Sequence, residues 1–110
     1  MSLYGSYIKE REDKEIIEDS RGFATYQFLD YDRCYIESIY VQPDFRNTNL
    51  ASEMADKIAI IAKERGCTKL VGSVSPTANG ATASLKVLLA YGFQLESSSN
   101  NLIVFVKDLE

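Results

Sequence analysis

Histidine is absent from this sequence of 110 residues. Its absence excludes the Ser-His and Cys-His nucleophile systems and leaves any zinc site without its usual nitrogen ligands. Cysteine is scarce, with only Cys34 and Cys67. Because no secretory leader is recognisable, we interpret them as buried free thiols rather than as a disulfide. The chemistry of this chain therefore has to rest on carboxylates, hydroxyls, basic side chains and the backbone.

Long apolar runs are also lacking, so we expect no membrane span and a cytoplasmic location. The net charge is −4 and the pI is near 4.8, which argues against nucleic acid as a partner because nucleic-acid binding normally needs a basic stripe. An acidic balance mildly favours a cationic substrate. Length and composition indicate one domain over residues 1–110, with enough apolar residues for a hydrophobic core.

The most informative segment covers residues 34–51 and reads as a strand, a polar loop and the start of a helix. Residues 34–41 are rich in β-branched and aromatic side chains and are followed by Pro43. A three-to-four spacing then predicts a helix over about 49–65 that ends at Gly66, with its apolar stripe at Leu50, Met54, Ile58 and Ile61.

The loop between them suits a phosphate, because the first N–H groups of a helix lack intrahelical partners and carry partial positive charge. Arg46 would add a cation and Thr48 a hydroxyl donor. Asn47 and Asn49 are the residues that we expect at positive φ in place of glycine. The alternative is an ordinary polar turn capped by Asn49.

The remaining pattern predicts an α/β fold with a mixed sheet. We expect a short helix over 6–12, strands over 14–19 and 23–29, a turn over 30–33, and a strand over 69–74 parallel to 34–41. A second helix follows over 79–90, with Leu85, Leu88 and Leu89 as its buried stripe, and strands 93–98 and 102–107 form a closing hairpin. The order is an antiparallel meander followed by β-α-β-α-β-β.

The segment over residues 41–51 resembles the acetyl-CoA motif of the GNAT superfamily of N-acetyltransferases. Its sequence is Val-Gln-Pro-Asp-Phe-Arg-Asn-Thr-Asn-Leu-Ala. Arg46 and Ala51 match its first and last positions, whereas Asn49 stands where the family usually has glycine. Gly92-Phe93 after an amphipathic helix resembles the second cofactor segment. The resemblance covers about residues 14–107 and implies a GNAT-like fold whose N-terminal segment, residues 1–13, is abbreviated.

The resemblance implies acetyl-CoA as cofactor and acetyl donor. It assigns the pantetheine arm to the backbone of Ile39, Tyr40 and Val41. The pyrophosphate falls to the loop, with Arg46, Asn47, Thr48, Asn49, Leu50 and Ala51 as the contacting residues. Asn79 is expected to cap the second helix, with a cofactor contact as the alternative. For Arg46 the alternative is an ion pair with Asp44 or Glu53.

Two residues are candidates for acid–base catalysis. Glu37 lies mid-strand among apolar residues, where burial would make it a stronger base for the acceptor amine. Its alternative is a solvent-facing carboxylate opposite a Lys or Arg on a neighbouring strand. The family's thiolate-protonating Tyr corresponds to Leu88, so Tyr91, and less well Ser84, would have to reach the sulfur. A Tyr91 packed on the core is the alternative.

The predicted function is therefore acetyl transfer from acetyl-CoA to an amine by direct attack, because no residue looks like a committed acyl-enzyme nucleophile. The alternative is a non-catalytic module that binds CoA or another protein. A homodimer, with contacts from residues 97–101 or the N-terminal segment, is a third arrangement. The acceptor is left open among polyamines, antibiotic amines, amino-acid derivatives and protein amines.

Overall fold

The computed structural model describes residues 2–30 and 32–109 of the chain. In chain order the elements are α1 (Leu3–Glu12), β1 (Glu15–Asp19), β2 (Gly22–Phe28), β3 (Arg33–Val41), the 3-10 helix η1 (Pro43–Phe45), α2 (Leu50–Glu64), β4 (Lys69–Val74), α3 (Ala81–Tyr91), β5 (Gln94–Ser99) and β6 (Leu102–Asp108). None of the helices in this part of the chain combines the length and apolarity needed to cross a bilayer.

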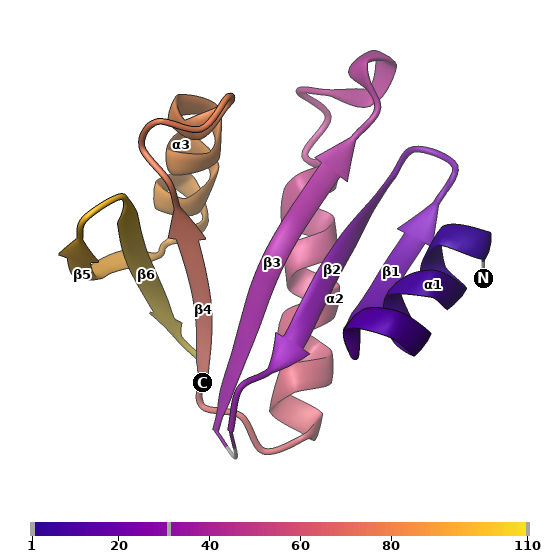
Figure 1. Cartoon of the computed structure of the whole chain (residues 1–110), viewed down its shortest axis with the longest axis horizontal. Helices are drawn as coiled ribbons and strands as arrows, with labels where there is room; N and C mark the ends of the chain where they lie inside the picture. The colour runs from indigo at the N-terminus through magenta and orange to yellow at the C-terminus, as the bar shows by residue number, and fades with distance from the viewer. Residues whose placement is uncertain (1, 31, 110) are drawn as a thin grey trace.

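The six strands form one mixed sheet in the order β1-β2-β3-β4-β6-β5 (Figure 1). The first three strands are an antiparallel meander, and β3 pairs in parallel with β4. The closing hairpin folds back so that β6, rather than β5, lies beside β4. The predicted mixed α/β architecture, with its parallel crossover, is confirmed.

Helix α2 supplies the largest helical part of the core. Its buried residues are Leu50, Met54, Ala55, Ile58 and Ala62, which matches the predicted stripe except that Ile61 is only partly buried. At its end Gly66 has a φ of 93°. The N–H of Gly66 donates to Lys63 and that of Cys67 to Ala62, so the last carbonyls of the helix are satisfied. Both cysteines are free and buried, as predicted.

Helices cover the two faces of the sheet. Ala24 of β2 belongs to the core cluster that includes the α2 side chains. The neighbouring Phe23 instead packs its ring 5.1 Å from that of Tyr4 on α1. Because adjacent residues of a strand point to opposite faces, α1 and α2 lie on opposite sides of the meander (Figure 1).

An extra residue interrupts β3. Ile36 pairs with Tyr26 and Ser38 pairs with Thr25, so Glu37 has no partner on β2 and forms a β-bulge. Cys34 and Ile36 face the core before the bulge, whereas the odd-numbered Ile39 and Val41 pack against it afterwards. A bulge bends its strand and increases the local twist.

The bulge coincides with a fork in the sheet. Pairing between β3 and β4 is confined to Arg33–Tyr35 and Lys69–Val71, and the two strands then diverge (Figure 1). The upper half of β3 consequently has a backbone edge that no described strand covers on the β4 side.

Three expectations need correction. Helix α1 begins at Leu3 rather than at residue 6, and α3 begins at Ala81 rather than at Asn79. Gly80, at a φ of 79°, precedes α3, and no side chain caps the helix there. Leu89 is 53 % exposed, because only Leu85 and Leu88 of the predicted stripe turn toward the core.

Candidate functional site

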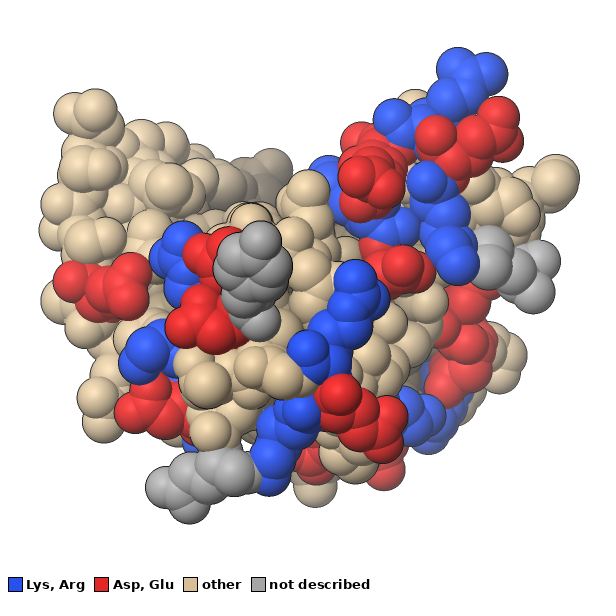
Figure 2. Space-filling view, turned by 90° about the horizontal axis from the view of Figure 1, so that it is seen from below, with Lys and Arg blue, Asp and Glu red and all other residues tan. Residues whose placement is uncertain are grey.

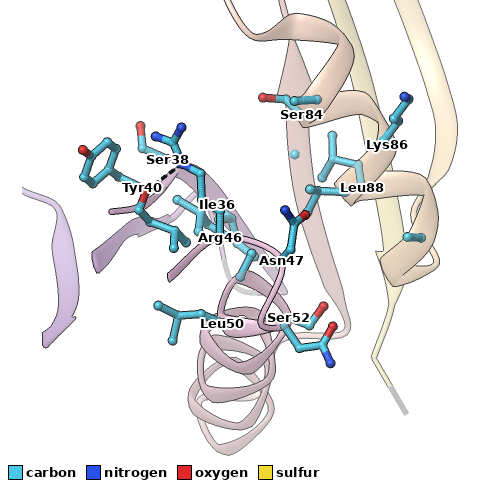
Figure 3. A pocket seen from close by; sticks show the side chains of 18 of the residues that line it. Ile36, Ser38, Tyr40, Arg46, Asn47, Leu50, Ser52, Ser84, Lys86 and Leu88 are labelled. Atoms are coloured by element: carbon cyan, nitrogen blue, oxygen red, sulfur yellow. Dashed lines mark hydrogen bonds between the residues drawn. The ribbon is translucent and has the colours of Figure 1, made fainter. Parts of the chain in front are cut away.

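The fork between β3 and β4 opens into a pocket of about 620 Å³. One wall is the diverging part of β3 with the loop and first turn of α2, and the other wall is α3 (Figure 3). Gly72 and Ser73 of β4 lie between the walls. The residues that line it are Ile36, Glu37, Ser38, Ile39, Tyr40, Val41, Phe45, Arg46, Asn47, Asn49, Leu50, Ala51, Ser52, Gly72, Ser73, Ala83, Ser84, Lys86, Val87, Leu88 and Ala90.

The loop after η1 turns sharply into α2. Asn47 and Asn49 have φ angles of 64° and 66°, which confirms the two positions predicted to be left-handed. Glu53 is the first residue of this helix whose N–H is bonded, to the carbonyl of Asn49. The amides of Leu50, Ala51 and Ser52 lie in the unpartnered first turn of α2, and all three residues line the pocket.

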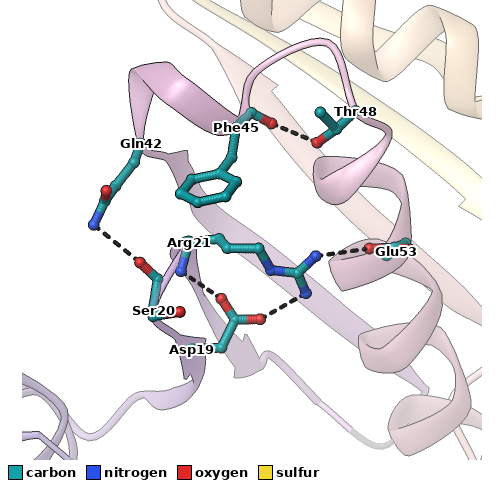
Figure 4. Close-up of polar contacts among 7 residues, drawn as sticks. All are labelled: Asp19, Ser20, Arg21, Gln42, Phe45, Thr48 and Glu53. Carbon is teal, nitrogen blue, oxygen red and sulfur yellow. Dashed lines mark hydrogen bonds and ion pairs between the residues drawn. The ribbon is translucent and has the colours of Figure 1, made fainter.

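Thr48 is oriented differently from expectation. Its hydroxyl donates to the carbonyl of Phe45, inside the loop (Figure 4), and Thr48 is not among the lining residues. A threonine hydroxyl that closes the loop on itself fixes the loop's shape rather than facing a ligand. The predicted contact from Thr48 to a phosphate is thus not supported by this geometry.

Arg46 extends along the pocket rim. Its Nε donates to the carbonyl of Val41 at 3.0 Å, and its guanidinium carbon lies 6.0 Å from the centre of the Tyr40 ring. The alternative ion pair with Asp44 or Glu53 does not occur among the described residues; Glu53 is 3.9 Å from Arg21 instead. Arg46 keeps its charge uncompensated by any carboxylate of the described chain, at the mouth of the site.

Residues of the β1–β2 turn contact Gln42, before this loop, and Glu53, after it (Figure 4). The N–H of Gln42 donates to the carbonyl of Arg21 at 2.8 Å, and its Nε2 donates to that of Ser20 at 3.0 Å. The Arg21 guanidinium bonds Asp19 at 2.9 Å and reaches Glu53 on α2. The bond from Arg21 lowers the pKa of Asp19, so this contact persists at neutral pH.

Glu37 is exposed rather than buried, because it is the bulge residue and no β2 residue pairs with it. Its Oε2 lies 2.5 Å from Nζ of Lys14. The expectation of burial is wrong, and the alternative of a carboxylate opposite a lysine is what the structure contains. Glu37 still lines the pocket.

Tyr91 and Asn79 lie outside the pocket lining. The Tyr91 hydroxyl donates to Oδ1 of Asp56 on α2 at 2.6 Å. Burial, and then this hydrogen bond, raises the pKa of Tyr91, so the phenol holds its proton more tightly than usual. In this orientation the Tyr91 hydroxyl points to Asp56 and not into the pocket, so the geometry does not support its predicted role, which stays a prediction. Ser84 and Leu88, in contrast, do line the pocket.

Sequence reasoning missed the Tyr35–Ser73 contact. The two hydroxyl oxygens lie 2.7 Å apart across the fork, and Ser73 lines the pocket. Lys86 on the α3 wall was also missed. A readable signal for the bulge did exist: the apolar residues at 34, 36, 39 and 41 break the strict alternation of a strand between 36 and 39.

The charges of the lining favour an anion at one end. Arg46 and Lys86 come from opposite walls (Figure 3), and Glu37 is the one carboxylate among the residues that line the pocket. On the face at the opposite end of the molecule, acidic and basic side chains are interspersed and the described residues form no basic stripe (Figure 2). The arrangement offers amides and the Arg46 guanidinium at one end of the pocket, and a carboxylate and hydroxyls where β3 and β4 separate.

Comparisons with known proteins agree with this geometry. The family model described as Acetyltransferase (GNAT) family matches residues 4–93. Comparison with curated proteins gives no significant match. A GNAT family acetyltransferase from Elizabethkingia anophelis, solved with acetyl-CoA bound, superposes with a TM-score of 0.73 at 19 % identity over 97 % of this chain and 82 % of that one. PaiA N-acetyltransferase from Thermoplasma acidophilum, in complex with coenzyme A, gives 0.75 at 14 % over 96 % and 69 %.

Proposed function

The chain belongs to the GNAT family of acetyltransferases, and from this premise we propose that it transfers an acetyl group from acetyl-CoA to an amine by direct attack. The observation that carries the proposal is the fork pocket, which joins a helix N-terminus with unpartnered amides to a carboxylate where two parallel strands separate. The two ends of the pocket match two groups of acetyl-CoA, its anionic pyrophosphate and its reactive thioester.

The loop would hold the pyrophosphate. Amides of Leu50, Ala51 and Ser52 would donate to it, with the Arg46 guanidinium beside them. The pantetheine arm would then run along the edge of β3 at Ile39–Val41, where β4 has already diverged. Its amide groups would pair with the exposed backbone much as another strand would.

Glu37 would act as the base. An amine attacks a thioester only when it is neutral, and a carboxylate at the pocket can accept its proton directly or through water. The Lys14 ammonium, 2.5 Å away, holds this carboxylate in place. Direct attack is favoured over an acyl-enzyme because Cys34 is fully buried, and burial raises the pKa of its thiol to about 12, so a thiolate is scarce there.

The acceptor would be a primary amine that enters as an ammonium. The pocket carboxylate and the net charge of −4 support a cationic acceptor. A homodimer in which a second copy completes the acceptor wall is an alternative arrangement, and light scattering at several protein concentrations distinguishes it from a monomer.

A second function, binding without catalysis, is favoured by one observation. Leu88 lines the pocket where the family often places a hydroxyl, and Tyr91 is bonded to Asp56 instead. In that case the chain would bind CoA and release no thiol from acetyl-CoA with any amine.

Calorimetric titration tests the cofactor site. We expect wild-type protein to bind acetyl-CoA and to bind S-acetylpantetheine, which lacks the pyrophosphate, far more weakly. Arg46→Ala should weaken acetyl-CoA binding by about ten- to a hundredfold, since a charge-assisted hydrogen bond contributes roughly 1.5–3 kcal/mol. Arg11→Ala, an exposed arginine on α1, is the matched control. Equal affinity for the two thioesters would contradict the loop's assignment.

Thiol release with a panel of primary amines tests the reaction. Glu37→Gln should lower kcat by at least about a hundredfold while acetyl-CoA still binds, because the amide cannot accept the proton. Glu96→Gln on the exposed strand β5 is the control. Full turnover by Glu37→Gln at saturating substrates would remove Glu37 as the base.

A further inference from the structure

The departing CoA thiolate needs a proton, and the pocket has to provide it. The resemblance to the family assigns the helix position that would face the sulfur to Leu88, which lines the pocket and has no proton to give. Tyr91 donates to Asp56 and lies outside the lining. An acetyltransferase built on this fork therefore needs another source for that proton.

The Tyr35–Ser73 pair lies at the closed end of the fork. Pairing of β3 with β4 ends at Tyr35 and Val71, and Ser73 is two residues farther along β4. The 2.7 Å contact between the hydroxyls of Ser73 and Tyr35 bridges the strands just where they separate. An acyl chain that enters from the loop end reaches its limit at this bridge, since the paired strands leave no gap beyond it.

The two hydroxyls have different access. Ser73 lines the pocket and Tyr35 does not, so a ligand in the pocket would lie nearer to the serine than to the phenol. A serine hydroxyl alone is a very weak acid, whereas a phenol gives up its proton far more readily. Ser84 also lines the pocket, on α3, but the described chain places no stronger acid in hydrogen-bond contact with it.

We propose that the Ser73 hydroxyl, supplied with its proton by Tyr35, protonates the CoA thiolate. The inference rests on the acetyl transfer proposed above. As the amine nitrogen bonds to the acetyl carbon, the C–S bond breaks and its electron pair stays on sulfur. Ser73 gives its proton to that sulfur and takes one from Tyr35, and the resulting phenolate regains a proton from solvent. Ser73 is the catalytic residue of the pair because it contacts the sulfur. Tyr35 is the positioning residue: it acts through Ser73, whose proton it replaces.

Kinetics with a small primary amine that wild-type protein accepts tests the pair. Tyr35→Phe and Ser73→Ala should each lower kcat by roughly a hundredfold with little change in the Kd of acetyl-CoA. The double variant should be no slower than either single one, because the residues act as a unit. Tyr7→Phe on α1 and Ser97→Ala on β5, both exposed, are the controls.

A second measurement needs no acceptor. The ultraviolet absorbance of the thiolate in bound CoA is titrated with pH in wild-type protein, Tyr35→Phe and Tyr7→Phe. A hydrogen bond from the pair stabilises the thiolate, so Tyr35→Phe should raise the pKa of the bound thiol, and Tyr7→Phe should leave it unchanged.

The outcomes separate the two proposals. Wild-type protein that fails to bind CoA would overturn the proposed function and this inference together. CoA binding and turnover that Tyr35→Phe leaves intact would overturn the pair alone. A loss of turnover that only Ser84→Ala causes would also overturn the proposal for the pair, because Ser84 on α3 would then be the proton donor.

Discussion

The two walls of the pocket differ in how they are held. Helix α2 buries Leu50, Met54, Ala55, Ile58 and Ala62, whereas no residue of α3 is fully buried. Helix α3 packs only partly buried side chains, such as Leu85 and Leu88, against the core, and its Ser84, Val87 and Leu88 line the pocket. One wall thus belongs to the hydrophobic core, and the other wall depends on what fills the gap. We infer that the folded chain prepares the α2 side for the cofactor and that the cofactor stabilises the α3 side.

The largest expected effect on stability comes from shortening an apolar side chain in each wall to alanine. Ile58 of α2 is 0 % exposed and Leu85 of α3 is half-buried. Ile58→Ala should lower the free energy of unfolding by about 3 kcal/mol, and Leu85→Ala should lower it by only about 1 kcal/mol, since less apolar surface returns to water. Urea denaturation monitored by circular dichroism measures both. Equal losses would contradict the comparison.

Ligand binding should reduce the difference in local stability between the α2 wall and the α3 wall. At a hundredfold excess over Kd, acetyl-CoA should stabilise the protein by about 2.7 kcal/mol. Hydrogen exchange should show the gain in protection of amides concentrated in α3, with α2 changing less outside its first turn. Acetyl-CoA that protects both helices alike would show that α3 is already as well held as α2.

The C-terminal turns of the two helices allow a finer test. Gly66 after α2 and Gly92 after α3 have φ angles of 93° and 105°. Alanine at either position should cost about 1 kcal/mol because of the positive φ. Gly92→Ala should cost slightly more, since its Cβ would lie 2.9 Å from Nζ of Lys107, whereas Gly66 has open space. Melting temperatures of the two variants, measured in parallel, rank them, and the reverse order would refute the steric argument.

The smallest effect should be a gain, and it lies in the well-packed part of the sheet. Thr25 on β2 pairs with Ser38 beside the bulge, and its buried hydroxyl has no hydrogen-bond partner in the described chain. Thr25→Val keeps the shape and removes the unsatisfied group, so it should raise the free energy of unfolding by about 1 kcal/mol. Thr82→Val, at an exposed position on α3, serves as the control. A loss of stability at residue 25 would mean that water satisfies this hydroxyl.

Local patterns predicted most of the fold and part of the site. The positive φ angles of Asn47 and Asn49, the helix stop at Gly66 and the strand over 69–74 follow from residue types that leave few choices. The errors at Glu37 and Tyr91 have another origin. Whether Glu37 is buried depends on its pairing with β2, and where Tyr91 points depends on Asp56, 35 residues earlier. The pairing at Glu37 leaves only an indirect trace in the nearby sequence, the broken alternation of apolar residues, and the contact of Tyr91 with Asp56 leaves none.

The extra residue in β3 has a consequence for how this family member can vary. Side chains before Glu37 alternate in one phase and those after it in the other. Any residue type could occupy position 37 without disturbing that phase. Deleting Glu37 would remove the bulge and restore plain alternation, with Ile39 and Val41 still facing the core, because Ile36 and Ser38 already pair with neighbouring residues of β2. The extra residue is therefore not what keeps the apolar side chains of β3 inside. What position 37 adds is the bend where β3 leaves β4 and the carboxylate that the proposed reaction uses.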